Sequence, residues 1–167
     1  MFRIALVPPE QRDAFAQEGA ALMVSMEPWV TLGTDLQRAM ALLADPVKEV
    51  HVARTEGGEL QGFALLDLTG PFRAYLHILS VAPRWQSKGL ATQLIALAEQ
   101  IAFRVSPNLF ICVSDFNQRA RALYERCGFE QCGVLKDYVV RGHDELLLRK
   151  TIGSRSDFAK GLLKFNT

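Results

Sequence analysis

The chain has 167 residues, of which 49% are hydrophobic, and this supply of apolar side chains suits the core of one domain better than the cores of two. Its 19 basic and 18 acidic residues leave a formal net charge of +1, so no overall field favours nucleic acid or an anionic membrane as a partner. Because it has neither an apolar run of about eighteen residues nor the apolar region of a signal peptide, we expect a cytoplasmic protein.

The predicted elements alternate between strand and helix patterns. Strand patterns are short apolar runs rich in β-branched or aromatic residues, and helix patterns repeat apolar residues every three or four positions. Prolines, glycines and capping residues mark the boundaries. In chain order we predict a strand over 2–7, helices over 10–25 and 31–43, strands over 48–54, 60–68 and 75–81, a helix from Leu90, a strand over 108–114, a helix after Asn117, and strands over 129–140 and 143–149.

Residues 81–91, Val-Ala-Pro-Arg-Trp-Gln-Ser-Lys-Gly-Leu-Ala, form a corner between a strand and a helix. The first N–H groups of a helix lack intrahelical partners and the helix dipole adds partial positive charge, so anions bind there readily. Gly89 lets a bulky anion approach the backbone, while Arg84 and Lys88 add full charges, which suits a phosphate. Neither the P-loop pattern nor the Gly-x-Gly-x-x-Gly fingerprint is present, which excludes those two nucleotide families.

A second pattern follows the strand over 108–114. Asn117 stands among the capping residues Asp115-Phe116-Asn117 at the head of a short helix, and Tyr124 follows about two turns later. Gly128 is placed to end this helix in the left-handed conformation, and Phe129 comes directly after it.

The two patterns, in this order and spacing, resemble the GCN5-related N-acetyltransferase (GNAT) family. The family's acyl-CoA loop is matched by Gln86-x-x-Gly89-x-Ala91 after Val81-x-Pro83, with Ala91 where many relatives have Gly. The family's second signature is matched by Asn117, Tyr124 and Gly128-Phe129.

The resemblance implies an α/β (α+β) fold: a mixed, twisted central sheet of six to seven strands flanked by about four helices. It covers residues 2–150, and we assign residues 1–150 to a single domain of this kind. Residues 151–167 form a C-terminal tail beyond it. Because the tail carries several large apolar side chains, which are costly to leave in water, we predict that it docks on its own domain or across a homodimer.

The resemblance also implies an enzyme that transfers an acetyl group from acetyl-CoA to a primary amine by direct attack in a ternary complex. Backbone groups of Leu79 and Val81 would pair with the pantetheine arm, and Asn117 would contact it as well. The pyrophosphate would lie on the loop made of Gln86, Ser87, Lys88, Gly89, Leu90 and Ala91.

The chemistry of this reaction asks for an acid and a base. An amine is mostly protonated at neutral pH, so a general base must take a proton from it, and an acid should protonate the departing thiolate. By its place in the motif Tyr124, near the thioester sulfur, is the candidate acid. His77 on the central strand and Glu27 in the helix linker are both candidate bases, and His77 is equally compatible with a hydrogen-bonded core histidine.

Two regions are candidates for the acceptor pocket. The first is the helix linker over 26–30, where Trp29 is as compatible with an inward-packed turn as with a binding role. The second is the last hairpin, which carries Tyr138, Arg141 and His143. The acceptor itself is left open among small amines, amino acids, aminoglycosides, protein N-termini and lysine side chains.

Two other functions fit the sequence less well than an acetyltransferase with direct attack. A catalytically inactive acyl-CoA-binding or regulatory module of the same fold is disfavoured because the loop and Tyr124 are intact. A cysteine nucleophile is disfavoured because Cys112, Cys127 and Cys132 lack a His/Asp signature, and we interpret them as buried thiols. The scattered histidines and the absence of a Cys-x-x-Cys pair give no support for a bound metal.

Overall fold

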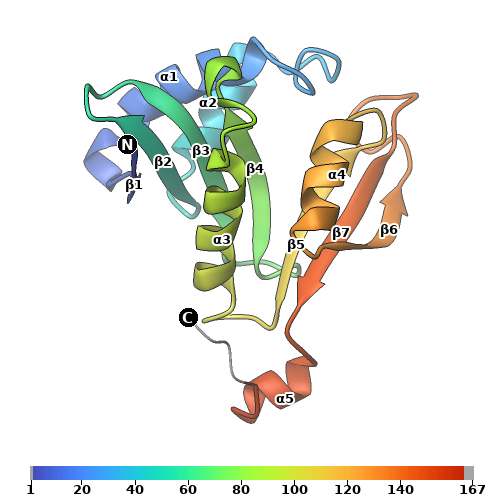
Figure 1. The fold of residues 1–167 in the computed structure, drawn as a ribbon. Helices are drawn as coiled ribbons and strands as arrows, with labels where there is room; N and C mark the ends of the chain where they lie inside the picture. Colours follow the sequence, from blue (N-terminus) through green and yellow to red (C-terminus); the bar gives the residue numbers. More distant parts are fainter. Residues whose placement is uncertain (1, 164–167) are drawn as a thin grey trace. The chain divides into compact units, whose positions relative to one another are not determined.

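The structure, a computed structural model, describes residues 2–163, which contain seven strands and five α-helices (Figure 1). The strands are β1 Phe2–Leu6, β2 Glu49–Thr55, β3 Leu60–Asp67, β4 Tyr75–Val81, β5 Asn108–Ser114, β6 Glu130–Leu135 and β7 Glu145–Thr151. The helices are α1 Arg12–Val24, α2 Leu36–Ala44, α3 Leu90–Ala102, α4 Gln118–Arg126 and α5 Arg155–Ala159, with short 3-10 helices at Pro9–Gln11 and Pro83–Trp85.

The strands form one mixed sheet in the order β1-β2-β3-β4-β5-β7-β6. β4 runs parallel to β5, with Tyr75 opposite Phe110. The pairs β1–β2, β5–β7 and β6–β7 are antiparallel. Seven strands agree with the predicted six to seven, and the element order agrees with the predicted one apart from the additional helix α5.

The chain forms two compact units, the first containing Met1–Leu65 and Ile78–Leu94 and the second Leu66–His77 and Ile95–Thr167. In the first unit, α1 and α2 pack together and cover the strands. Its core is a cluster of buried apolar side chains in which the rings of Phe15 and Phe63 meet edge to face, with their centroids 5.2 Å apart. The buried Arg12 donates to the backbone oxygen of Lys48 at 2.8 Å and so ties α1 to the start of β2.

In the second unit, α4 lies against β5 and β7, and β6 forms the outer edge (Figure 1). Leu109, Ile111 and Val113 alternate along β5 and are buried, whereas Phe110 and Cys112 between them are only half-buried. The side chains of a strand point alternately to the two faces of its sheet, so this unit has one fully buried face and one more open face.

The sequence predicted β4 and β5 with their observed bounds, and the glycine that ends α4 has the predicted left-handed conformation, with φ of 85° at Gly128. Two predicted bounds were wrong by more than two residues. The helix predicted over 31–43 begins at Leu36, because the side chain of Asp35 caps it by accepting from the N–H of Arg38 at 2.8 Å. The strand predicted over 129–140 ends at Leu135, and residues 136–144 form a loop instead of a tight turn.

None of the helices in residues 2–163 is long and apolar enough to cross a membrane.

Candidate active site

The predicted anion loop lies wholly within the first unit, between the end of β4 and the start of α3. Ser87 and Gly89 both have left-handed backbones, with φ of 61° and 81°. The backbone oxygen of Gly89 accepts the N–H of Gln93 at 3.1 Å, which makes Gly89 the residue from which α3 starts. Left-handed residues in such a turn direct neighbouring N–H groups into one concavity, and the helix start adds its own N–H groups.

The space beside this loop is open. A Cβ atom added to Gly89 would meet no other atom within 4 Å, so a ligand can reach the backbone there. The need for glycine comes instead from its φ of 81°, which other residues adopt only with strain. The loop therefore fits a polyphosphate group held by backbone N–H groups.

The two cations of the loop are not equivalent, contrary to the expectation that both face the anion. Arg84 forms an ion pair with Glu59 at 2.7 Å, so its charge is already compensated. Lys88 places its ammonium 4.8 Å from the centre of the Trp85 ring, and the Arg84 guanidinium lies 5.2 Å from the same ring. Lys88, which is exposed and has no ion pair among the described residues, is the cation available to a phosphate.

Gln86 braces the loop against the strand before it. Its side-chain amide donates to the backbone oxygen of Val81 at 2.9 Å, so this side chain is turned toward β4. Leu79 is half-buried and Val81 is buried at the end of the same strand, while Leu90 is buried and Ala91 half-buried at the start of α3. The first unit therefore holds together the predicted donor residues with the exception of Asn117.

Asn117 and Tyr124 belong to α4 in the second unit. The side-chain oxygen of Asn117 caps the helix by accepting from the N–H of Ala120 at 3.2 Å, which leaves its amide group as the donor for a ligand. Tyr124 is buried beside Phe129, with ring centroids 5.9 Å apart. Burial raises the pKa of the Tyr124 phenol above its usual value, so the phenol keeps its proton at neutral pH.

His77 lies on the more open face of the second unit. It is half-buried, and its ring lies 5.3 Å from that of Tyr75, centre to centre. Directly opposite residues on neighbouring strands share a face. The register pairs Tyr75–Phe110, Phe110–Arg149, Cys112–Leu147 and Ser114–Glu145 therefore put one set of side chains on this face. We call it the Glu145 face, and its members are Tyr75, His77, Phe110, Cys112, Ser114, Glu145, Leu147 and Arg149.

Sequence reasoning did not single out Tyr75, Ser114 or Glu145. Glu145 is 6% exposed, and the hydroxyl of Ser114 donates to its carboxylate at 2.5 Å. The Tyr75 phenol also interacts with the Cys112 thiol on the neighbouring strand, which adds to the rise of the Tyr75 pKa. Burial raises the pKa of both the Tyr75 phenol and the Glu145 carboxyl. The sequence signal for Glu145 is that this acidic residue stands directly before the apolar run Leu146-Leu147-Leu148.

Glu27 is in the first unit, exposed in the linker between α1 and α2. Its carboxylate accepts from both the N–H and the hydroxyl of Thr31, at 3.2 and 3.0 Å. In the same linker Trp29 is half-buried and packs against the core cluster, as in the inward-packed alternative. The structure thus gives Glu27 a local structural role and puts it in a different unit from His77 and Tyr124.

The cysteines differ from the expectation of buried thiols. Cys112 and Cys127 are half-buried and Cys132 is exposed. Burial raises the pKa of both the Cys112 and the Cys127 thiol, which keeps them protonated and weakens them as nucleophiles. In the loop between β6 and β7, His143 contacts Phe116 edge to face and lies 3.4 Å from the carboxylate of Asp115.

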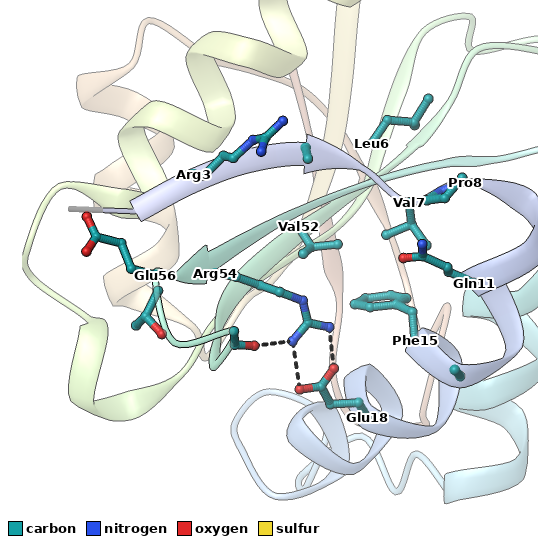
Figure 2. Close-up of a pocket in the computed structure, with 14 residues that line it drawn as sticks. Arg3, Leu6, Val7, Pro8, Gln11, Phe15, Glu18, Val52, Arg54 and Glu56 are labelled. Atoms are coloured by element: carbon teal, nitrogen blue, oxygen red, sulfur yellow. Dashed lines mark hydrogen bonds and ion pairs between the residues drawn. The ribbon is translucent and has the colours of Figure 1, made fainter.

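A groove of about 820 Å³ lies elsewhere in the first unit, between β1, β2 and α1 (Figure 2). At one side of it Arg54 donates to both carboxylate oxygens of Glu18, at 3.0 and 2.5 Å. The hydrogen bond to Glu18 raises the pKa of Arg54. None of the predicted site residues lines this groove, so it is separate from the candidate donor site.

The chain is similar to known proteins over most of its length. Residues 13–129, more than half of the chain, match the model of the acetyltransferase (GNAT) family. The chain is 30% identical over 145 residues to N-alpha-acetyltransferase RimI of Mycobacterium tuberculosis, covering 84% of this chain and 87% of the relative.

Solved structures share the fold. The ribosomal-protein-S18-alanine N-acetyltransferase of Escherichia coli superposes with a TM-score of 0.71 at 19% identity, covering 92% of this chain and 96% of the other. The yncA protein of Salmonella typhimurium, solved with its cofactor acetyl-CoA, gives a TM-score of 0.70 at 17% identity, covering 93% and 96%. The chain belongs to the acetyltransferase (GNAT) family, and it is an acetyl-CoA-dependent N-acetyltransferase.

Proposed function

We propose that the enzyme transfers the acetyl group of acetyl-CoA to the α-amino group of a protein N-terminus, by direct attack in a ternary complex. The observation that carries the choice of acceptor is the similarity to N-alpha-acetyltransferase RimI over most of both chains. The structural likeness to the S18-alanine acetyltransferase is consistent with it.

The donor would be held mainly by backbone. The two left-handed residues, Ser87 and Gly89, together with the first turn of α3 would bind the pyrophosphate, and Lys88 would supply the full positive charge. Backbone groups of Leu79 and Val81 would pair with the pantetheine arm. The side-chain amide of Asn117 would donate to the same arm, since its oxygen is used in the helix cap.

The acid of the reaction would be Tyr124. A phenol is protonated at neutral pH, which is the state that a proton donor needs. Burial raises the pKa of Tyr124 further, so its proton can pass only to a base that forms beside it. His77, on the Glu145 face of the same unit, would serve as a base candidate. Glu27, the other base candidate, lies in the helix linker, where both of its carboxylate oxygens already accept hydrogen bonds from Thr31.

The acceptor class also has a chemical basis. An α-amino group has a pKa near 8, whereas that of a lysine side chain is above 10. At physiological pH the unprotonated fraction is therefore larger for an N-terminal amine than for a lysine side chain. Less help from a general base is needed to make it a nucleophile.

The donor assignment is tested by Gly89→Val. The substitution forces a β-branched residue into a φ of 81°, so the loop must change shape and acetyl-CoA binding measured by calorimetry should be abolished. Gly70→Val is the matched control, because Gly70 has φ of 70° and equally open surroundings but lies in the loop after β3. Binding that survives in the Gly89 variant as well as in the control would refute a backbone cradle at this loop.

The acceptor assignment is tested with four amines offered at equal concentration. They are a short peptide with a free N-terminal alanine, the same peptide with a formylated N-terminus and one internal lysine, free alanine, and a small polyamine. We expect mass spectrometry to show acetylation of the free N-terminus at a kcat/KM at least about tenfold above the others. Preferred acetylation of the polyamine or of lysine would replace the proposed acceptor without removing acetyl transfer.

A further inference from the structure

Glu145 is a buried acid at the edge of the Glu145 face. It begins β7, opposite Ser114 at the end of β5. Only 6% of the residue is exposed, and its described hydrogen bond is the one that it accepts from the Ser114 hydroxyl at 2.5 Å. A glutamate is rarely buried to this extent without a cationic partner.

Among residues 2–163, no lysine, arginine or histidine forms an ion pair with Glu145. The titratable groups that interact with it are Tyr75 on β4, Cys112 on β5 and Asp115 directly after β5, and none of them is a cation. Arg149 is on the same face but four residues further along β7, where it is exposed and lies opposite Phe110 and Glu130. The nearby His143 is directed at Asp115, with 3.4 Å between nitrogen and oxygen. An ionised carboxylate in these surroundings lacks the positive charge that normally offsets its desolvation.

A protonated acceptor amine carries the positive charge that the surroundings of Glu145 lack. We propose that Glu145 binds the ammonium group of the acceptor amine and takes its proton, so that it is a further catalytic residue of the reaction; this inference rests on the proposed function. The half-buried aromatic rings of Tyr75 and Phe110 on the same face provide an apolar wall beside the charge. This combination suits a protonated amine attached to a carbon chain.

The proton transfers balance in three steps. The ammonium group gives one proton to the Glu145 carboxylate, and the neutral amine forms a bond to the acetyl carbonyl carbon. The carbon–sulfur bond then breaks, and Tyr124 gives its proton to the departing thiolate. The amide nitrogen loses its second proton to the Tyr124 phenolate, and Glu145 releases its proton to solvent with the product. The products are an acetylated amine and free CoA thiol.

The two proton-transfer groups come from different elements of the second unit. Tyr124 is a buried residue of the helix α4. Glu145 begins β7, on the face that also carries Cys112 and Ser114. A base that acts on the entering nitrogen and an acid that acts on the leaving sulfur need separate positions, and this arrangement supplies them.

The first test compares Glu145→Gln with Glu130→Gln. Glutamine keeps the shape and the oxygen that accepts from Ser114 but cannot take a proton, so kcat/KM for the acceptor should fall by about 10² or more. The acceptor KM should rise, while the Kd for acetyl-CoA stays the same. Glu130, exposed on β6 of the same unit, is the control and should retain full activity.

The second test changes the pKa of Glu145 without removing it. The Ser114 hydroxyl bonds the ionised carboxylate and so lowers its pKa, against the larger raising effect of burial. Ser114→Ala should therefore raise that pKa. Because the reaction needs the ionised carboxylate, the acidic limb of the kcat/KM profile should shift to higher pH. A merely structural role for Ser114 would change stability and leave this limb in place.

The outcomes separate the inference from the proposed function. If the wild-type protein acetylates no amine, the proposed function fails. If the wild type is active but Glu145→Gln equals Glu130→Gln, or if Ser114→Ala does not move the acidic limb, the inference is wrong. A parallel His77→Gln variant identifies the group that produces the acidic limb. If the acidic limb disappears in His77→Gln but remains in Glu145→Gln, His77 is the base and the role of Glu145 is overturned.

Discussion

At the scale of single residues, burial keeps the Tyr124 phenol in its protonated form. The phenol is packed beside Phe129 under α4, and burial raises its pKa. A phenol in water already holds its proton at neutral pH, and the shift strengthens this hold. A thiolate that forms beside it is then the group that can draw the proton away.

The consequence is a prediction for Tyr124→Phe. The variant loses one hydroxyl and keeps the ring that packs on Phe129, so the fold and acetyl-CoA affinity should be retained. Turnover should fall by about 10² or more, the usual contribution of a positioned acid. Steady-state kinetics beside calorimetric titration with acetyl-CoA would check both parts. Full turnover in the variant would remove Tyr124 from the mechanism.

The sequence predicted the donor loop but not the Glu145 face. Residues 86–91 are consecutive, so their pattern is visible in a single stretch of chain. Glu145, by contrast, gains its meaning from residues far away in sequence: Ser114 lies 31 positions earlier, and Tyr75 comes from another strand. Strand register decides such neighbours. The pairing of Arg84 with Glu59 was missed for the same reason.

At the scale of elements, the predicted bounds held where local chemistry fixes them. β5 is followed directly by the residues that cap α4, and α4 ends at Arg126, two residues before Gly128, so these boundaries can be read from the sequence. The predicted start of α2 was wrong because apolar residues before it also fit a helical repeat. The helix begins after Asp35, because the side chain of Asp35 accepts a hydrogen bond from the N–H of Arg38.

This cap gives an element-scale prediction. Asp35→Ala removes the acceptor for the Arg38 N–H and a negative charge at the positive end of the α2 dipole, so the free energy of unfolding should fall by about 1 kcal/mol. Gln37→Ala, at an exposed position of the same helix, is the control and should change stability by less than about 0.5 kcal/mol. Equal urea midpoints for the two variants would contradict the role of the cap.

At the scale of the whole molecule, the C-terminal tail contains the helix α5. Ser154 caps α5 by accepting from the N–H of Asp157 at 3.0 Å, and this helix lies beyond the end of β7 (Figure 1). Leu163 packs closely on Gly153, where an added Cβ would lie 2.7 Å from it, while Leu162 is 65% exposed. Phe165, another large apolar residue of the tail, lies outside the described residues.

We predict that the tail docks, on its own domain or across a homodimer, and test this by ending the chain after Ser154. Loss of the half-buried Phe158 and Leu163 should cost about 1 to 3 kcal/mol, which lowers Tm by several degrees, or should change the oligomer size. Calorimetry and size-exclusion chromatography measure the two. A chain ending after Leu163 is the control for the described part. Identical Tm and size in both shortened chains and the full chain would show a passive tail.

The division of labour between the two units has a consequence for how such an enzyme diversifies. On the proposed assignments, the donor loop is confined to Ile78–Leu94, whereas Glu145 and the face around it belong to the other unit. The donor is held largely by backbone conformation, so many side-chain changes leave it intact. On the same assignments, substitutions in Leu66–Leu76 or in β7 after Glu145 would retarget the enzyme to a new amine while acetyl-CoA use is inherited unchanged. Acceptor choice would therefore drift faster in descent than donor choice.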